Sequence, residues 1–245
     1  MMLTERELER YDRQIRLLNF GVEGQSRLKA AKILVAGVGG LGSAAALYLA
    51  AAGVGKLVLV DKESIELSNL NRQILYTTDD LGKPKAKVAA NRLSSLNPEI
   101  SIEAITVEIN EDNVSELIKG CDVVMDGQDN YKTRYVLNDA CIAQRIPFVH
   151  ASVHAYEGRL MTILPGKGPC YRCLVPVPPP EGRGFPILGT VPGTISTLQA
   201  TEAIKIVLGI GKLCVGRLLV YDALEMKFHE IKVERNPECS SCGLL

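Results

Sequence analysis

The sequence predicts an α/β protein whose mostly parallel, Rossmann-like sheet has helices on both faces and is extended by antiparallel strands near the C-terminus. Three observations support this prediction. Short β-branched segments alternate with helical patterns from residue 32 to residue 151, as in a parallel sheet. A glycine-rich turn joins the first of these strands to the first helix. After residue 151 the alternation stops, and segments typical of antiparallel strands follow.

The composition is that of an ordinary globular protein, with 47% hydrophobic and 23% charged residues in a chain of 245. The 28 basic residues balance the 28 acidic ones, which argues against the broad basic surface of a general nucleic-acid binder. The longest uncharged run, residues 33–55, contains six glycines and is predicted to be strand, turn and helix rather than a membrane span. The charged segment 1–16 is unlike a secretory signal, so we expect a cytoplasmic protein with reduced or metal-bound cysteines.

The first part of the chain, residues 1–30, is expected to be helical. Thr4 and Glu7 have the spacing of a capping box. Apolar residues then recur at helical intervals and predict one N-terminal helix, at Leu8, Tyr11, Ile15 and Leu18.

The second part, residues 31–151, is expected to hold the parallel sheet. Its predicted elements are strand 32–36, helix 41–52, strand 57–60, helix 84–96, strand 100–107, short helix 111–119, strand 122–125, helix 131–144 and strand 147–151.

The third part, residues 152–245, is expected to add antiparallel strands at 159–164, 217–221 and 227–233, with a helix at 194–208. Five prolines fall within residues 175–186, where no periodicity is present. We therefore predict a crossing loop over residues 175–192. The three parts are expected to form a single domain over residues 1–245.

The glycine turn, residues 37–42, fits the pattern G-x-G-x-x-G between a strand and a helix. Such glycines let a phosphate approach the backbone and the helix N-terminus. Asp61 ends the second strand, 24 residues after Gly37, where a carboxylate can bind ribose hydroxyls. The pattern predicts a nucleotide site, although taken alone it fits NAD as well as ATP, and glycines also serve tight helix–strand packing.

Cations and amides after Asp61 favour a triphosphate over NAD. Arg72 can bind phosphate oxygens with two parallel hydrogen bonds, and Lys85 can act on them as a mobile charge. Surface cations on a solvated helix are the simpler interpretation of either residue alone. Their position behind a glycine loop favours the phosphate role.

Asp126 and Asp129 follow the strand at 122–125, where the carboxyl edge of the sheet is expected. Either carboxylate could hold Mg²⁺ on a nucleotide phosphate, and we favour Asp129. The alternative for Asp129 with Asn130 is an N-cap of the next helix, a role that does not exclude metal binding.

Two Cys-x-x-Cys pairs, 65 residues apart, provide four thiolates, the set that binds structural Zn²⁺. The alternative is a pair of redox-active or disulfide-bonded dithiols. The predicted zinc ligands are Cys170, Cys173, Cys239 and Cys242. The other three cysteines lie in apolar patterns and are expected in the core, namely Cys121, Cys141 and Cys214.

In this order, the motifs resemble those of the MoeB/ThiF family, the bacterial and archaeal relatives of ubiquitin-activating enzymes. The resemblance extends from about residue 9 to residue 243. It is carried by the glycine loop, by the two cysteine pairs and by the segments 10–14, 68–73, 82–85 and 126–130, which read RYDRQ, SNLNRQ, GKPK and DGQDN.

The resemblance implies MgATP-dependent adenylation of the C-terminal glycine of a small ubiquitin-like sulfur carrier, with release of pyrophosphate, in a dimeric protein. It also implies roles for particular residues. Asp129 would bind Mg²⁺, and Arg13 would reach the phosphates in the partner subunit's site. The implied ATP-binding residues are Gly40, Asp61, Asn69, Arg72, Gln73 and Lys85.

A glycine carboxylate is already ionised at neutral pH, so the reaction needs no general base. This agrees with the three histidines, which fall in strand-like segments where a core or surface role is expected: His150, His154 and His229. The crossing loop has no cysteine, so no covalent carrier intermediate is expected there. The sulfur donor, a cysteine desulfurase or a rhodanese, is expected to be a separate protein.

Several alternatives stay open at this point. The carrier could serve molybdopterin, thiamine, cysteine or thiolated-tRNA synthesis, because the surface of the carrier sets that choice. A relative within the family could instead activate a tRNA-borne carboxylate. An NAD-dependent oxidoreductase would rest on the glycine loop and Asp61 alone. Gly127 and Gln128 depart from the residues usual between the two aspartates, so the nucleotide preference is open too.

Overall fold

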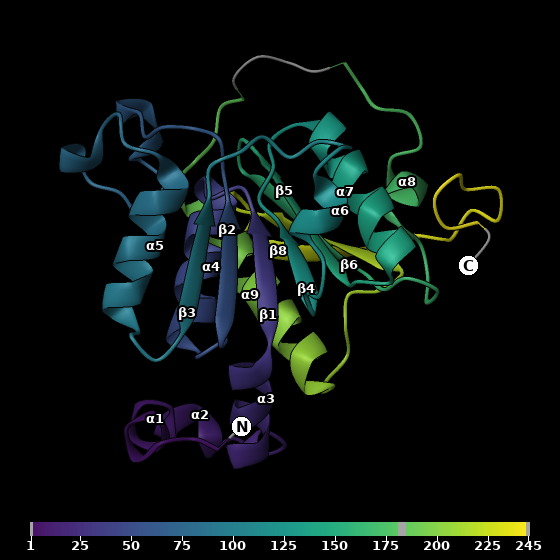
Figure 1. Cartoon of the computed structure of the whole chain (residues 1–245). Helices are drawn as coiled ribbons and strands as arrows, with labels where there is room; N and C mark the ends of the chain where they lie inside the picture. Colours follow the sequence, from purple (N-terminus) through teal and green to yellow (C-terminus); the bar gives the residue numbers. More distant parts are fainter. Residues whose placement is uncertain (1, 181–184, 244–245) are drawn as a thin grey trace.

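An eight-stranded sheet runs through the chain in the order β3-β2-β1-β4-β5-β6-β7-β8 (Figure 1). The computed structural model describes residues 2–180 and 185–243. Strands β1 to β5 are parallel, and β6, β7 and β8 continue the sheet antiparallel. The strands are β1 (Lys32–Ala36), β2 (Lys56–Val60), β3 (Ser101–Ile105), β4 (Val123–Asp126), β5 (Phe148–His154), β6 (Glu157–Ile163), β7 (Arg217–Asp222) and β8 (Lys227–Lys232).

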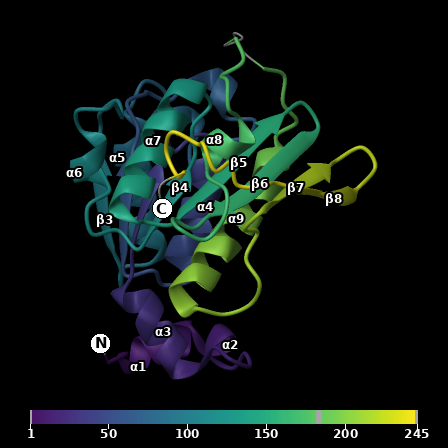
Figure 2. The same ribbon diagram turned by 90° about the vertical axis from the view of Figure 1, so that its right-hand side faces the viewer.

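Helices cover both faces of this sheet (Figures 1 and 2). The α-helices in the part of the chain that the structure describes are α1 (Glu5–Arg10), α2 (Asp12–Ile15), α3 (Gly21–Ala30), α4 (Gly40–Ala51), α5 (Lys85–Leu96), α6 (Val114–Leu117), α7 (Tyr131–Gln144), α8 (Tyr171–Leu174) and α9 (Thr190–Leu208). Two short 3-10 helices are η1 (Leu67–Asn69) and η2 (Thr78–Asp80).

The sheet separates two hydrophobic cores. Successive residues of β1 point to opposite faces, so Ile33 and Val35 join the core under α4, α5 and α9, whereas Leu34 joins the core under α6 and α7. Strands buried on both faces are what a parallel sheet requires, and they explain the unbroken apolar runs in the sequence. The predicted fold class is confirmed.

The N-terminal prediction is partly wrong. The capping box at Thr4 and Glu7 is present, but the single helix predicted through Leu18 is divided into α1 and α2, and α3 follows after a break. The chain leaves the helical path at Tyr11, whose hydroxyl accepts a hydrogen bond from Asn97 at 2.8 Å. Leu18, expected on the buried face, is 90% exposed. The contact of Tyr11 with a residue 86 positions away has overridden the local helical pattern.

Most other elements lie within a few residues of their predicted bounds, and α7 matches its prediction at both ends. Helix α9 begins four residues early because Pro192 falls in its first turn, where backbone N–H groups have no helical partner. The short helices η1, η2 and α8 were not predicted. No helix in the described residues is both long and apolar enough to span a membrane.

Candidate active site

The carboxyl ends of β1, β2 and β4 meet at one edge of the sheet and form the base of the candidate site. Ala36 is in register with Val60 on β2 and with Asp126 on β4. The chain crosses to one side of β1 and later returns to the other, so this edge is the switch point where open α/β sheets bind ligands. Here Gly37 N donates to Val60 O at 2.7 Å, and Gly127 N donates to Ala36 O at 2.8 Å.

The glycine loop turns the chain sharply from β1 into α4. Gly37 has a φ of +91°, and a Cβ atom at Gly42 would lie 1.8 Å from the carbonyl oxygen of Gly37. Helix α4 begins at Gly40, so its first N–H groups are free to bind an anion at this edge. The loop therefore needs its glycines for its own path and also presents a phosphate-binding helix end.

Asp61 lies directly after β2 and beside the glycine loop. Its Oδ2 accepts a hydrogen bond from Val38 N at 2.7 Å, and its Oδ1 accepts one from Glu63 N at 2.8 Å. Burial raises the pKa of Asp61, against the opposing effects of these two hydrogen bonds and of the Lys85 charge. Each carboxylate oxygen keeps a second lone pair, which is what ribose hydroxyls require.

Asn69 and Gln73 are both buried beside this edge. Asn69 Oδ1 accepts a hydrogen bond from Glu66 N at 3.1 Å and thereby holds the turn. The Nε2 atom of Gln73 lies 3.6 Å from the position a Cβ would take at Gly39. Its Oε1 is buried with no hydrogen-bond partner among the described residues, an arrangement that fits a group that receives a ligand.

Arg72 lies across the start of α4. Its Cδ is 3.5 Å from the position of a Cβ at Gly40. Its guanidinium donates to Ser68 O and to Asn71 Oδ1, both at 3.0 Å. These are neutral acceptors, so no carboxylate competes with a phosphate for the charge through these bonds.

Lys85 points its ammonium group at Glu63, a residue that the sequence analysis did not single out. The distance from Nζ to Oε2 is 2.6 Å, and the Lys85 side chain is 3% exposed whereas that of Glu63 is 56% exposed. An isolated bridge between Ser64 and Pro84 brings these two segments together. Local sequence gave no signal for this pair, because the partners are 22 residues apart and belong to different elements.

Asp126, the other carboxylate considered for Mg²⁺, is enclosed by protein donors. It is fully buried, and its Oδ2 contacts Arg134 Nε at 3.1 Å and His150 Nδ1 at 2.7 Å, while Oδ1 accepts from Gln128 N at 3.0 Å. Burial alone would raise the pKa of Asp126, but the Arg134 charge and the His150 hydrogen bond outweigh it and lower that pKa. We call Asp126, Arg134 and His150 the buried ion cluster. The core role expected for His150 is confirmed.

Asp129 lies three positions after Asp126 and is exposed. The pKa of Lys62, the neighbour of Asp61, is raised mainly by its hydrogen bond with Glu108 and to a smaller extent by the Asp129 charge. Asn130 is the N-cap of α7 and accepts a hydrogen bond from Thr133 N at 2.8 Å. The capping role therefore belongs to Asn130, and the carboxylate of Asp129 is left available.

Helix α2 (Asp12–Ile15), which carries Arg13, lies at the opposite edge of the sheet (Figure 1). The adjacent Gln14 donates to Ala52 O at 2.7 Å, at the C-terminal end of α4. The glycine loop is at the other end of this 12-residue helix, about 18 Å away. Arg13 is exposed and does not meet the other candidate residues within one chain.

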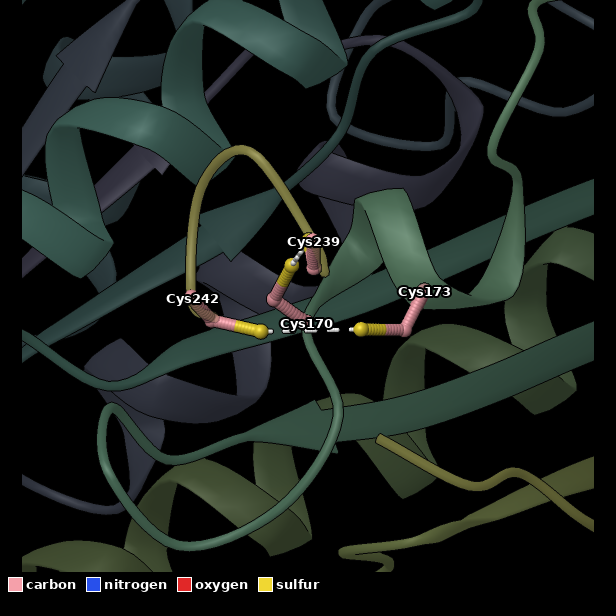
Figure 3. A group of neighbouring side chains, drawn as sticks. All are labelled: Cys170, Cys173, Cys239 and Cys242. Atoms are coloured by element: carbon pink, nitrogen blue, oxygen red, sulfur yellow. Dashed lines mark hydrogen bonds between the residues drawn. The ribbon is translucent and has the colours of Figure 1, made fainter. Parts of the chain in front are cut away.

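The four predicted zinc ligands converge from two distant segments (Figure 3). Their sulfur atoms all lie within 4.8 Å of one another, with Cys170 to Cys239 at 3.6 Å and Cys173 to Cys242 at 3.5 Å. A tetrahedral zinc with 2.3 Å bonds separates its sulfurs by about 3.8 Å. These residues, which we call the thiolate cluster, therefore fit a closed zinc site and not disulfides, whose sulfurs lie about 2.05 Å apart.

Local hydrogen bonds favour the thiolate at Cys239, whereas burial raises the pKa of Cys170 and that of Cys242. Burial raises the pKa of Cys239, but backbone N–H groups and neighbouring thiols lower it to about 7. Asn236 N donates to Cys173 Sγ at 3.4 Å. The three remaining cysteines are buried in the core, as predicted: Cys121, Cys141 and Cys214.

The crossing loop is only partly within the described residues, since 181–184 lie outside them. Its distal limb contacts the turn after β5, where Ala155 N donates to Pro186 O at 2.8 Å and Leu188 N donates to Ala155 O at 3.1 Å. Gly189 then packs so closely on Asn71 that a Cβ would lie 2.2 Å from Asn71 O. The loop therefore ends against the segment that carries Arg72.

Known proteins are similar to this chain in sequence and in fold. The chain is 45% identical over 248 residues to the SAMP-activating enzyme E1 of Haloferax volcanii, covering 99% of this chain and 92% of that protein. It is 45% identical over 253 residues to the sulfur carrier protein adenylyltransferase of Thermus thermophilus, covering 99% and 93%. A crystal structure of Escherichia coli MccB with ATP superposes with a TM-score of 0.87 at 27% identity, covering 98% of this chain and 75% of that one.

The family model for ThiF matches residues 11–241, almost the whole length of the chain. The match includes the glycine loop, the segments after β2 and β4 and three of the four predicted zinc ligands, whereas Cys242 lies just beyond its end. The resemblance seen in the sequence is thus confirmed, and the chain belongs to the ThiF family.

Proposed function

We propose that this chain uses ATP to adenylate the C-terminal glycine of a small ubiquitin-like sulfur-carrier protein and releases pyrophosphate. The observation that carries the proposal is the gathering of a ribose-type carboxylate, a free helix N-terminus and two cations at one sheet edge. The full-length similarity to a sulfur carrier protein adenylyltransferase supports the same reaction.

In this reaction, the protein must bring a carboxylate to a polyanion. The carrier carboxylate is already ionised, so catalysis rests on charge neutralisation and alignment. Asp61 would hold the ribose, and the N–H groups at Gly40 would hold a phosphate. Arg72 would bind the phosphates, and Lys85 would leave Glu63 to neutralise the charge that develops during transfer.

Asn69 and Gln73 would complete the nucleotide pocket, Asn69 by holding the turn and Gln73 by its unpartnered oxygen. Asp129 is the residue we assign to Mg²⁺, which when bound would neutralise phosphate charge. Zinc in the thiolate cluster would have a structural role, because four protein ligands leave no open position.

We also propose that the active unit is a homodimer in which Arg13 acts on the phosphates in the site of a second copy. Gln14, the neighbour of Arg13, contacts Ala52 at the far end of α4 from the glycine loop, and that helix is about 18 Å long. Leu17 and Leu18, just after it, are 58% and 90% exposed, an apolar segment that a second copy could cover. A separate protein would supply the sulfur.

The test is ATP–pyrophosphate exchange with a panel of ubiquitin-like carriers that end in Gly-Gly. Each carrier is paired with a form that lacks the terminal glycine, and the Lys85→Met variant serves as the enzyme blank. We expect exchange with one intact carrier and none with its truncated form. Exchange with truncated carriers would refute the assignment of the substrate, and the responding carrier would name the pathway.

A further inference from the structure

The buried ion cluster holds the backbone of the loop 126–130 in place. Arg134 lies in the first turns of α7 and points back toward β4, where it donates to Asp126 Oδ2 and to Gln128 O. Gly127 between them packs on the glycine loop so tightly that a Cβ would lie 2.4 Å from Gly37 O. Arg134 therefore holds the 126–130 loop directly and, through Gly127, supports the glycine loop.

Tyr171 connects this cluster to the thiolate cluster. It lies between the ligands Cys170 and Cys173, and it is 1% exposed. Its ring centroid is 4.7 Å from that of His150, and its phenol interacts with the guanidinium of Arg134. A shift of the Cys170–Cys173 segment would therefore move Tyr171 against His150 and Arg134, the residues that hold the 126–130 loop.

Both halves of the thiolate cluster are also attached to α7. Tyr171 N donates to Asn138 Oδ1 at 2.8 Å. Arg172 binds the Asp139 carboxylate, with its shortest contact at 2.6 Å, and Ser241 Oγ donates to the same carboxylate. These contacts lie two turns, about 12 Å, from the N-terminal end of α7, where Asp129 precedes the helix.

We propose that Arg134 and Tyr171 are positioning residues that couple the thiolate cluster to the nucleotide site. Metal in the cluster fixes α8 and the segment 236–243 against α7, and through Tyr171 and Arg134 it holds the 126–130 loop in the form that receives phosphates. The inference rests on the proposed function, because it takes MgATP as the ligand. Such coupling is reciprocal, so zinc raises the affinity for MgATP by the factor by which MgATP raises the affinity for zinc.

The experiment measures both sides of this equilibrium without carrier protein. Calorimetry gives the Kd of MgATP for zinc-loaded and zinc-depleted protein. Competition with a chromogenic zinc chelator gives the zinc affinity with and without MgATP, and Mg²⁺ without nucleotide is the blank. We expect both affinities to change by at least about fivefold, and by matching factors.

Tyr171→Phe removes the phenol but keeps the ring and all four cysteines. We expect this variant to bind zinc and to reduce the coupling factor to within about twofold of one. Arg134→Lys keeps the charge but cannot reach both Asp126 and Gln128, and we expect it to weaken MgATP binding about tenfold in zinc-loaded protein. The matched control is Tyr156→Phe. The ring of Tyr156 is exposed in the turn between β5 and β6, so loss of its hydroxyl should leave the coupling unchanged.

The outcomes separate this inference from the proposed function. If zinc-loaded protein binds no MgATP, the proposed nucleotide role is wrong. If it binds MgATP equally well with and without zinc, the coupling is refuted and the function stands. If zinc depletion unfolds the protein, the decision falls to zinc-loaded Tyr171→Phe, and unchanged MgATP binding by that variant refutes the route through Tyr171.

Discussion

Replacing Asp126 by asparagine tests the idea that a buried ion cluster holds the floor of the site. The carboxylate is fully buried and accepts three hydrogen bonds, from Arg134 and His150 on Oδ2 and from Gln128 N on Oδ1. An asparagine amide has only one acceptor oxygen, so its NH₂ group must face at least one of these donors. The variant also leaves the buried guanidinium of Arg134 without a counter-charge.

The expected cost is about 3 to 5 kcal/mol, the range found when one partner of a buried ion pair is removed. For a chain of this size, that corresponds to a fall in Tm of roughly 6 to 20 °C. Because whole-domain stability is about 5 to 15 kcal/mol, the variant should still fold at low temperature. The matched control is Asp12→Asn, since Asp12 is 51% exposed in its pair with Arg16 and such pairs contribute about 0 to 1 kcal/mol.

The assay is scanning calorimetry of zinc-loaded protein for Asp126→Asn, Arg134→Met and the double variant. Because the double variant removes both charges, it should be less destabilised than the sum of the single variants, with an interaction free energy of about 2 kcal/mol. Equal Tm values for Asp126→Asn and Asp12→Asn would refute the reasoning. Strict additivity in the double variant would show that the two side chains do not stabilise each other.

Four further predictions concern the site and its supports. Lys85→Met should reduce ATP–pyrophosphate exchange by about 30-fold or more, since a charged contact to phosphate is lost, and an unaltered rate would remove Lys85 from the mechanism. When Arg13→Ala subunits are mixed with Lys85→Met subunits, the mixture should regain ATP–pyrophosphate exchange that neither variant has alone, because one site of the mixed dimer keeps both residues. No recovery of exchange would contradict the action of Arg13 across the dimer. A chelator should lower Tm by several degrees and free the segment 236–243 to proteolysis, whereas absence of zinc by elemental analysis would contradict the metal site. Burial lowers the pKa of His150, so the folded state resists protonation of this side chain, and the stability that the neutral imidazole contributes is present above about pH 6.5 and is lost as the pH falls below that value. His150→Gln should therefore flatten the decline of the urea midpoint at low pH. An equally steep decline in the variant would assign the pH dependence to other groups.

The sequence was sufficient for the parts of the site that depend on local structure. The glycine loop, Asp61 and Lys85 each belong to a short motif at the end of a strand or the start of a helix. Parallel pairing of β1 with β2 then brings the glycine loop and Asp61 together, and the isolated bridge between Ser64 and Pro84 brings in Lys85. The thiolate cluster could be predicted for a different reason, since two Cys-x-x-Cys pairs have few other uses in a reduced protein.

The failures come from contacts between distant residues. Asp126 was considered for Mg²⁺ as the alternative to Asp129, because its partners Arg134 and His150 lie on other elements and no local pattern shows that they face it. The same holds for Glu63, whose partner Lys85 is 22 residues away. The N-terminal helix was predicted too long because Tyr11 is drawn to Asn97 on another part of the chain.

The position of Arg13 supports a dimer more strongly than its motif does. The other assigned nucleotide-site residues belong to the segments that follow β1, β2 or β4, and these strands end together at the carboxyl edge of the sheet. Arg13 is tied to the opposite edge through Gln14 and Ala52, at the far end of α4. No side chain spans the length of that helix. A phosphate role for Arg13 therefore requires a second chain whose N-terminal helices lie against the glycine loop, and Arg13→Ala should lower exchange without changing the fold of its own site.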